Sequence, residues 1–152
     1  MELESCLGRI DVSEEDIIVF PQGILGFEEY KRYLVLEQPD SVFRFLQCVD
    51  EPQLAFVVMY PELVDAAYSV VLTEEQKALL EIEQPEDGVV YGIVTIPEQV
   101  AEMTINLQAP VVINKRRRIG AQIVLMDGKY TTRHNVLAGM QAAAYLAQKG
   151  KD

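Results

Sequence analysis

A length of 152 residues predicts a single domain, and a hydrophobic fraction of 49% supplies enough apolar side chains for one buried core. No apolar run reaches the ~18–20 residues that a membrane-spanning helix needs, and the acidic start of the chain is unlike a secretory signal, which is basic and then apolar. We therefore expect a cytoplasmic protein that neither spans nor binds a membrane.

The net charge of −11 is unevenly distributed along the chain. Residues 1–110 hold 22 acidic and 5 basic residues, a net charge of −17, whereas residues 111–152 hold 2 acidic and 8 basic residues, a net charge of +6. An acidic body repels phosphate, so direct nucleic-acid binding is not expected. The same charge would attract a basic protein and speed its association. The alternative is that the acidic residues simply keep the protein soluble.

Short runs of β-branched and aromatic residues, separated by turn residues, predict many strands. The predicted strands are residues 17–20, 33–36, 42–49, 55–59, 89–96, 111–113 and 123–125. Strands that recur about every 8–12 residues are typical of an all-β barrel or sandwich. Asp127-Gly128 predicts a two-residue hairpin between a strand that ends at Met126 and one that begins near Tyr130.

Two helices are predicted among these strands. Thr73-Glu74-Glu75-Gln76 has the pattern of a capping box, in which Thr73 and Gln76 satisfy each other's backbone N–H groups. Near the C-terminus, Asn135 is suited to cap a helix whose apolar residues recur at helical spacing. These apolar residues are Val136, Leu137, Met140, Ala144 and Ala147. The C-terminal helix would pack either on its own barrel or on a partner.

No motif predicts catalysis, a metal site or a cofactor. His134 is the only histidine, the chain has no G-x-S-x-G elbow, and the adjacent carboxylates lie in turns instead of converging across a cleft. Cys6 and Cys48 have no CxxC partner and are expected to be free thiols. The alternative in a different class is a small hydrolase or isomerase that uses His134 with a nearby carboxylate.

Two turns have the composition of interaction sites. Pro21-Gln22-Gly23-Ile24-Leu25-Gly26-Phe27 contains two glycines but lacks the lysine of a phosphate-binding loop, so its apolar residues either close the barrel end or face a partner. Lys115-Arg116-Arg117-Arg118 places four consecutive cations in one turn. Without interleaved aromatic residues, that turn indicates solvent exposure or contact with an acidic protein more than RNA binding.

A series of motifs in the right order resembles one family. The segment Phe20–Glu28, FPQGILGFE, resembles the FPxGIxGFE motif of the FliW family, and further similar blocks follow it as far as residue 137. These blocks are LQCV at 46–49, LAFVV at 54–58, IVTIPE at 93–98, MTINLQAP at 103–110, VIN at 112–114 and YTTRH at 130–134.

The resemblance implies both a fold and a function. FliW proteins are mostly β, and we expect a small antiparallel β-barrel with one short internal helix and a C-terminal helix. Residues 1–137 would form the single FliW-like barrel domain, and residues 138–152 a helical tail. FliW proteins bind the translational repressor CsrA and relieve repression of flagellin mRNA, and they also bind flagellin as a partner switch. A dedicated flagellin chaperone without a translational role is the alternative.

The densest motifs also supply the predicted partner-binding residues. These are Phe20, Pro21, Gly23, Ile24, Gly26, Phe27, Glu28, Met103, Asn106 and Asn114. Equally, the glycines, the proline and Asn106 could serve backbone geometry alone. CsrA must present basic surface to RNA, so an acidic partner bound beside that surface would repel phosphate over a Debye length, ~8–10 Å. Electrostatic or allosteric antagonism and direct competition both remain open, and the free protein is expected to be monomeric.

Overall fold

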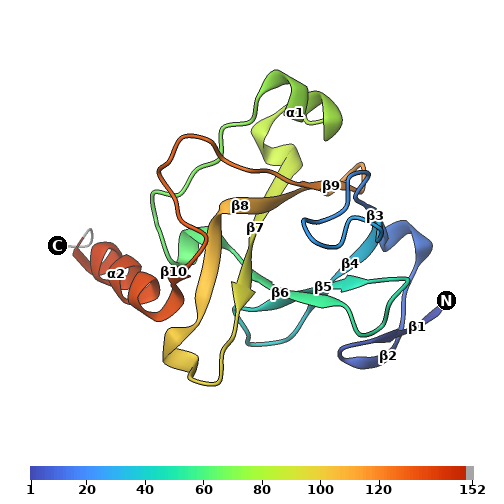
Figure 1. The fold of residues 1–152 in the computed structure, drawn as a ribbon, viewed down its shortest axis with the longest axis horizontal. Coiled ribbons are helices and arrows are strands. Elements are labelled where there is room, and N and C mark those ends of the chain that lie inside the picture. Colours follow the sequence, from blue (N-terminus) through green and yellow to red (C-terminus); the bar gives the residue numbers. More distant parts are fainter. Residues whose placement is uncertain (150–152) are drawn as a thin grey trace.

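Seven strands close into a barrel in the structure, a computed structural model that describes residues 1–149 (Figure 1). The order around the barrel is β8-β7-β6-β5-β4-β3-β9, and β9 pairs with β8 to complete the circle. The strands are β3 (Ile18–Val19), β4 (Arg32–Glu37), β5 (Arg44–Cys48), β6 (Ala55–Met59), β7 (Gly88–Thr95), β8 (Thr104–Asn114) and β9 (Ile119–Gln122).

The barrel closes because β8 is long enough to pair with two strands, β7 and β9. Its 11 residues pair with β7 over most of their length, and its C-terminal part also pairs with β9. A register shift in β7 between Tyr91 and Ile93 is the kind of irregularity that bends a sheet toward closure. The predicted antiparallel barrel is confirmed, with one parallel contact, Val19 beside Ile119, between β3 and β9.

The barrel interior is filled by alternate side chains of the strands. Along β8, Ile105 and Leu107 are buried whereas Thr104 and Asn106 are half-buried, as expected for a strand with one face toward the core. Phe20 and Tyr33 meet edge to face inside the barrel, with ring centroids 5.1 Å apart. Aromatic pairs of this geometry stabilise a core beyond the area they bury.

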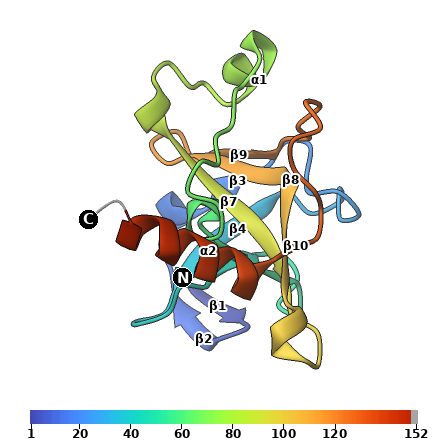
Figure 2. The same cartoon turned by 90° about the vertical axis from the view of Figure 1, so that its left-hand side faces the viewer.

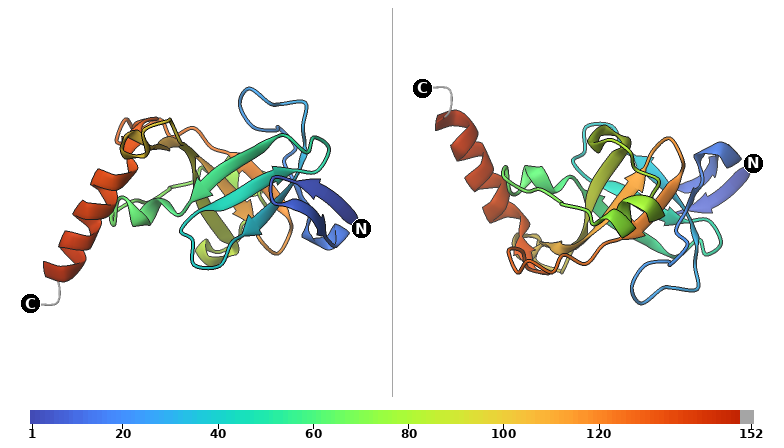
Figure 3. Two further views of the ribbon diagram at one scale, coloured as in Figure 1. Left: turned by 90° about the horizontal axis from the view of Figure 1, so that it is seen from below. Right: turned by 90° about the horizontal axis from the view of Figure 1, so that it is seen from above.

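Both predicted helices are present. The first is α1 (Glu74–Leu79), and its capping box is confirmed, since Thr73 Oγ1 accepts from the Gln76 N–H at 3.1 Å while Gln76 Oε1 accepts from the Thr73 N–H at 2.9 Å. The second is α2 (Val136–Lys149), which extends away from the barrel (Figure 3). The proposed boundary between residues 137 and 138 falls inside α2, and residues 150–152 of the predicted tail lie outside the described residues.

The hairpin predicted at Asp127-Gly128 is wrong. Within residues 1–149 no strand ends at Met126 or begins at Tyr130. Asp127 Oδ1 instead accepts from the Lys129 N–H at 3.1 Å and forms a local turn. The tertiary reason is that the following chain folds back over β8: Thr131 O accepts from the N–H groups of Leu107 and Gln108.

The remaining elements are short and lie around the barrel. An N-terminal hairpin pairs β1 (Glu2–Ser5) with β2 (Gly8–Asp11), outside the barrel sheet and at the end of the molecule opposite α2 (Figures 1 and 3). The others are η1 (Glu14–Asp16), η2 (Pro61–Leu63), η3 (Pro85–Asp87), η4 (Val100–Glu102) and the two-residue strand β10 (His134–Asn135), which pairs with β8. Among residues 1–149, no helix has the length and apolar character to cross a membrane.

Candidate functional site

The turn from residue 20 to residue 30 is built from buried anchors and tight backbone. Phe20 and Ile24 are almost fully buried in the barrel core. Gly23 adopts φ +68°, and a Cβ at this position would lie 2.6 Å from the Cα of Glu28, so the two arms of the turn can approach only at a glycine. The Phe27 N–H donates to Ile24 O at 2.7 Å. These residues hold the rest of the turn in a fixed shape.

Glu28 closes the turn from the outside. Its Oε1 accepts from the Gly26 N–H at 3.0 Å. This hydrogen bond, together with that from its own N–H, lowers the pKa of the Glu28 carboxyl, and Lys31 adds to the effect. Glu28 is therefore ionised at neutral pH and contributes both to the turn and to the surface charge.

Two large apolar side chains of the turn face solvent. Leu25 is 60% exposed and Phe27 is 37% exposed. Phe27 leans on Phe56 of β6 with ring centroids 5.3 Å apart, so its exposed edge has a defined position. Leu25 is fixed through its backbone, because its N–H donates to Gln122 Oε1 at 2.9 Å. Two exposed apolar side chains on a turn with a fixed backbone are typical of a contact surface.

Carboxylates from three loops lie near Tyr30 and Arg32, at the end of this turn. Burial raises the pKa of the Tyr30 phenol, and the nearby Glu29 and Glu51 carboxylates raise it further. Arg32 binds Asp50 with Nη2–Oδ1 and Nε–Oδ2 distances of 2.6 Å and 3.1 Å. That bond raises the pKa of the Arg32 guanidinium, to which the Glu14 carboxylate also contributes. We call this group the acidic pole and define it as Glu14, Glu28, Glu29, Asp50 and Glu51.

The ten predicted contact residues differ in what they present to a partner. Pro21, Gly26, Phe27 and Glu28 are exposed. Asn106 is half-buried, and the other five, listed next, are buried. The buried residues are Phe20, Gly23, Ile24, Met103 and Asn114. No measurement tests their role in binding, which stays a prediction, but the buried side chains have structural roles in the free protein.

The two asparagines among them make identifiable hydrogen bonds. Asn106 Oδ1 accepts from the N–H groups of Gln108 and Ala109, which bends β8 locally. Asn114 is fully buried, and its Nδ2 donates to Leu80 O at 2.9 Å and to Glu81 O at 3.1 Å. Its Oδ1 accepts from two N–H groups of the basic turn, those of Arg116 and Arg117. Asn114 therefore fixes the position of both α1 and that turn.

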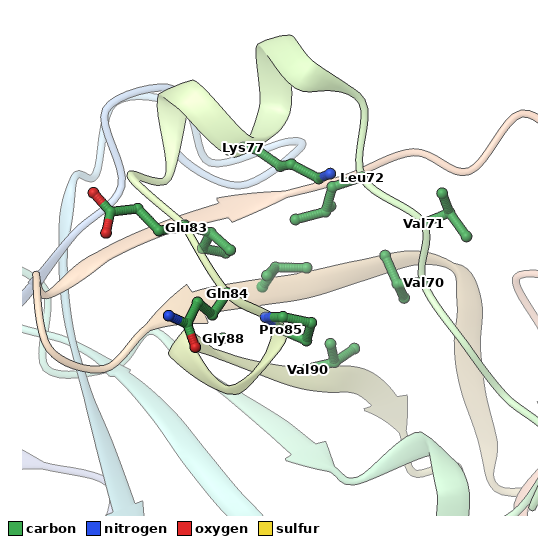
Figure 4. A pocket seen from close by; sticks show the side chains of 11 residues that line it. Val70, Val71, Leu72, Lys77, Glu83, Gln84, Pro85, Gly88 and Val90 are labelled. Atoms are coloured by element: carbon green, nitrogen blue, oxygen red, sulfur yellow. The ribbon is translucent and has the colours of Figure 1, made fainter.

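Two apolar hollows lie elsewhere on the surface. The first is a cavity of about 310 Å³ beside α1, bordered by Val70, Leu72 and Val90 with Lys77 and Glu83 at its rim (Figure 4). The second, of about 340 Å³, lies between α2 and the chain that follows η2. Figure 2 shows α2 crossing in front of the barrel, and its contacts are with η2, η4 and β10. Either hollow has the apolar lining that suits a partner's side chain.

His134 borders the second hollow together with Asp65. Its backbone belongs to β10 and pairs with Ile105 of β8. The other residues that line this hollow are mainly alanines with Val64 and Leu146, which offer no group for acid–base chemistry. Within residues 1–149, no three His, Cys, Asp or Glu side chains are grouped so that they could hold a metal ion.

Comparison with known proteins places the chain in a family. The sequence profile described as "FliW protein" matches residues 3–136. The chain belongs to the FliW family. The Flagellar assembly factor FliW of Ruminiclostridium cellulolyticum is 39% identical over 136 residues, which cover 88% of this chain and 92% of that protein. The Treponema denticola protein of the same name is 37% identical over 144 residues, which cover 94% of this chain and 98% of that protein.

A solved FliW structure confirms the family at the level of the fold. The crystal structure of the flagellar assembly factor FliW superposes with a TM-score of 0.85 and 35% sequence identity, covering 90% of this chain and 96% of that one. The profile match ends at residue 136, the first residue of α2. The relatives and the solved structure are named flagellar assembly factors, and none of these names denotes an enzyme.

Sequence reasoning found the turn but missed most of its surroundings. The predicted set did not include Leu25, although the FPQGILGFE segment contains it. It also omitted Glu29 and Glu51, because adjacent carboxylates in turns are usually no more than solvated surface. The only indication of this surface in the sequence was the excess of acidic over basic residues in residues 1–110. A charge count does not show which loops meet in space.

Proposed function

We propose that this protein binds the translational repressor CsrA and thereby relieves repression of flagellin mRNA, and that it also binds flagellin, so that the two partners exchange. Membership of the FliW family, whose relatives are named flagellar assembly factors, supports a role in flagellar assembly. The partner switch is the mechanism that the resemblance to FliW implies for this chain.

The observation that carries the proposal is the acidic surface around the turn of residues 20–30. An RNA-binding repressor presents basic groups to phosphate, and a partner with a net charge of −17 over residues 1–110 is attracted to such groups. Once bound, the acidic partner lowers the affinity of the repressor for RNA even without covering the RNA site, since repulsion extends over ~8–10 Å at physiological salt.

The proposal extends to the organisation of the chain. Residues 1–137 would form the domain that binds both partners. Residues 138–152 would form a tail that is not needed for this binding. The protein would act as a monomer in the cytoplasm, without a cofactor and without direct contact with nucleic acid or membrane. Light scattering of the purified protein measures its molar mass in solution and so tests whether it is a monomer.

The decisive experiment is a titration of the protein into CsrA bound to flagellin leader RNA from the same species, at low and at high salt. We expect RNA release at low salt that weakens as salt rises. If the RNA stays bound and no ternary complex forms, the regulatory proposal fails. Addition of flagellin to the released mixture should restore the RNA complex, which tests the exchange.

A dedicated flagellin chaperone is the second candidate. The apolar hollows beside α1 and α2 favour it, because each suits the apolar face of an amphipathic helix. This candidate predicts flagellin binding that is indifferent to CsrA. Competition between CsrA and flagellin for the protein would exclude it.

A further inference from the structure

We infer that the hollow at the end of the barrel beside the basic turn (Lys115–Arg118) is a binding site for a small aliphatic carboxylate. We call this hollow the barrel mouth. It has a volume of about 320 Å³ and is bordered by Lys115 and Arg118, by Asp16 and by residues of β3, β4, β7 and β8. The inference goes beyond the proposed function, because neither protein partner takes part in it.

The barrel mouth lies where four strands begin or end. β3 begins at Ile18 and β7 at Gly88, whereas β4 ends at Glu37 and β8 at Asn114. Since β5 and β6 separate β4 from β7 in the sheet, residues of both strands line one hollow only across the end of the barrel. The ends of β-barrels are frequent positions of small-molecule sites, whose volumes are about 300–1,000 Å³. A volume near the lower limit requires a small ligand.

The walls of the barrel mouth are mainly aliphatic. Among the residues that form them are Ile18, Leu34, Val89 and Ile113. The one aromatic residue in the lining, Tyr91, already stacks on Tyr60, with ring centroids 5.3 Å apart and an interplanar angle of 14°. One face of the Tyr91 ring is therefore covered, and the walls favour an aliphatic body for the ligand over an aromatic one.

The charged groups at the barrel mouth favour an anion. Asp16, Glu37, Lys115 and Arg118 line the hollow. Glu37 pairs with Arg44 at 3.3 Å, whereas the ion pair between Arg118 and Asp16 is long, at 4.0 Å. Lys115 forms no ion pair within residues 1–149. A ligand carboxylate would therefore find two cations to bind, whereas an ammonium group would meet carboxylates that already lie opposite guanidinium groups.

The backbone of the basic turn is fixed at the rim of the barrel mouth. The Arg118 N–H donates to Asn114 O at 2.9 Å, and the Arg118 carbonyl accepts from the Val19 N–H at 3.0 Å. Arg118 has φ +56°, a conformation that is uncommon for residues other than glycine. Such a conformation persists only where the surrounding structure holds it. A turn that is already ordered loses little entropy when a ligand binds to it.

The other hollows of the described chain match an anionic ligand less well. The cavity beside α1 has one cation, Lys77, which already pairs with Glu74 at 3.3 Å. The adjoining hollow around Arg117 is bordered by three glutamates. The hollow beside α2 is lined by Asp65 and by no lysine or arginine of residues 1–149. The barrel mouth therefore combines aliphatic walls with two cations that a carboxylate can reach.

Isothermal titration calorimetry of the purified protein with octanoate tests the site. Octanol and octylamine have the same aliphatic chain with a neutral and a positively charged head group, so they test the sign of the charge. We expect octanoate to bind, and both other compounds to bind at least about tenfold more weakly. Heteronuclear NMR locates the ligand, and the amide shifts of Ile18, Val89 and Ile113 should move on addition of octanoate.

Two substitutions with matched controls test the charged groups. Lys115→Gln should weaken octanoate binding about tenfold. Its control, Arg117→Gln, makes the same change in net charge within the same turn but at a residue that borders the hollow beside α1, and should change binding less than about twofold.

Asp16→Asn should tighten octanoate binding about threefold, because it removes a carboxylate that repels the ligand and pairs with Arg118. Glu15→Gln makes the same change in net charge one residue earlier and should have little effect. Thermal melting confirms that all four variants are folded.

The inference is overturned if octanoate does not bind, or if it binds Lys115→Gln and Arg117→Gln equally well. It also fails if octylamine binds more tightly than octanoate, because the carboxylates would then select the ligand. Amide shifts confined to α2 or to the cavity beside α1 would place the ligand in another hollow and have the same consequence. None of these results depends on CsrA or flagellin, so the proposed function is tested separately.

Discussion

The buried side chain of Gln47 binds the backbone of Cys6, 41 positions away in sequence. Its Oε1 accepts from the Cys6 N–H at 2.8 Å. Its Nε2 donates to the carbonyls of Cys48, Pro52 and Leu54 at 3.0–3.2 Å. One amide on β5 therefore attaches the N-terminal hairpin to the turn between β5 and β6, the turn that carries Asp50 and Glu51 of the acidic pole.

Replacing Gln47 with leucine should loosen this attachment. Leucine fills a similar volume but leaves a buried N–H and carbonyl groups without partners, which costs about 1–3 kcal/mol. We expect a lower denaturation midpoint and faster amide hydrogen exchange at Cys6. Gln53→Leu, in the exposed part of the same loop, is the control. A Gln47→Leu variant as stable as this control would show that the hydrogen bonds contribute nothing net.

The two glycines of the FPQGILGFE turn should differ in their tolerance of alanine. Both have positive φ, +68° at Gly23 and +88° at Gly26, so each alanine has a backbone cost of roughly 1 kcal/mol. A Cβ at Gly26 meets no atom within 4 Å, whereas at Gly23 it would lie 2.6 Å from the Glu28 backbone. Gly23→Ala should therefore be the more destabilising by about 1–3 kcal/mol. Urea denaturation of the pair measures the difference, and equal losses would mean that the turn relaxes freely.

Asn114 is expected to be more important for stability than Asn106. Asn114→Leu leaves the Leu80 and Glu81 carbonyls and two N–H groups of the basic turn without their partner, at a cost of about 1–3 kcal/mol. Asn106→Leu disrupts only a local turn within β8, and should cost about 1 kcal/mol. Thermal unfolding compares the two. The reverse order would show that the bend in β8 matters more than the attachment of α1.

The sequence predicted the elements whose signals are local. The capping box at Thr73 and Gln76 forms as the pattern predicts, because both hydrogen bonds lie within one helical turn. Six of the seven predicted strand runs coincide with strands of the structure, but the strand predicted at residues 123–125 is wrong, because β9 ends at Gln122. The hairpin at Asp127-Gly128 failed because Thr131 binds the backbone of β8 instead, a tertiary interaction that no local pattern reveals.

The candidate site was predictable only in part for the same reason. Phe20 to Glu28 form one continuous turn, so a motif could identify it. Glu14, Glu29 and Glu51 come together only because β3, β4 and the turn after β5 meet at one end of the barrel. Their convergence is a property of the closed barrel. The charge count along the chain predicted that the protein has a negatively charged surface, but it did not predict where on the barrel that surface lies.

Acid should weaken the contact between Arg32 and Asp50. The hydrogen bond from Arg32 holds the pKa of the Asp50 carboxyl below its usual value. Its contribution to stability is therefore present above the unfolded pKa of about 3.9 and is lost as pH falls through the folded pKa. Since both side chains are nearly half exposed, we expect less than about 1 kcal/mol.

The substitution Asp50→Asn isolates that contribution. The difference in unfolding free energy between wild type and Asp50→Asn should be largest near neutral pH and should vanish in strong acid. Glu98→Gln, which removes a carboxylate elsewhere on the surface, is the control. A difference that stays constant as pH falls would rule out the charged pair as its source.

The start of α2 depends on Asn135. Its Oδ1 accepts from the Ala138 N–H at 2.8 Å, and its Nδ2 donates to Ala101 O in η4 at 3.0 Å. Asn135→Ala removes both bonds and should cost about 1 kcal/mol of helix stability. Because α2 contacts the rest of the chain mainly through η2, η4 and β10, the loss should appear as reduced helicity and faster amide exchange in α2. Asn135→Asp keeps the acceptor and should restore most of the protection, whereas α2 amides that exchange at the wild-type rate in Asn135→Ala would show that packing against η2 alone holds the helix.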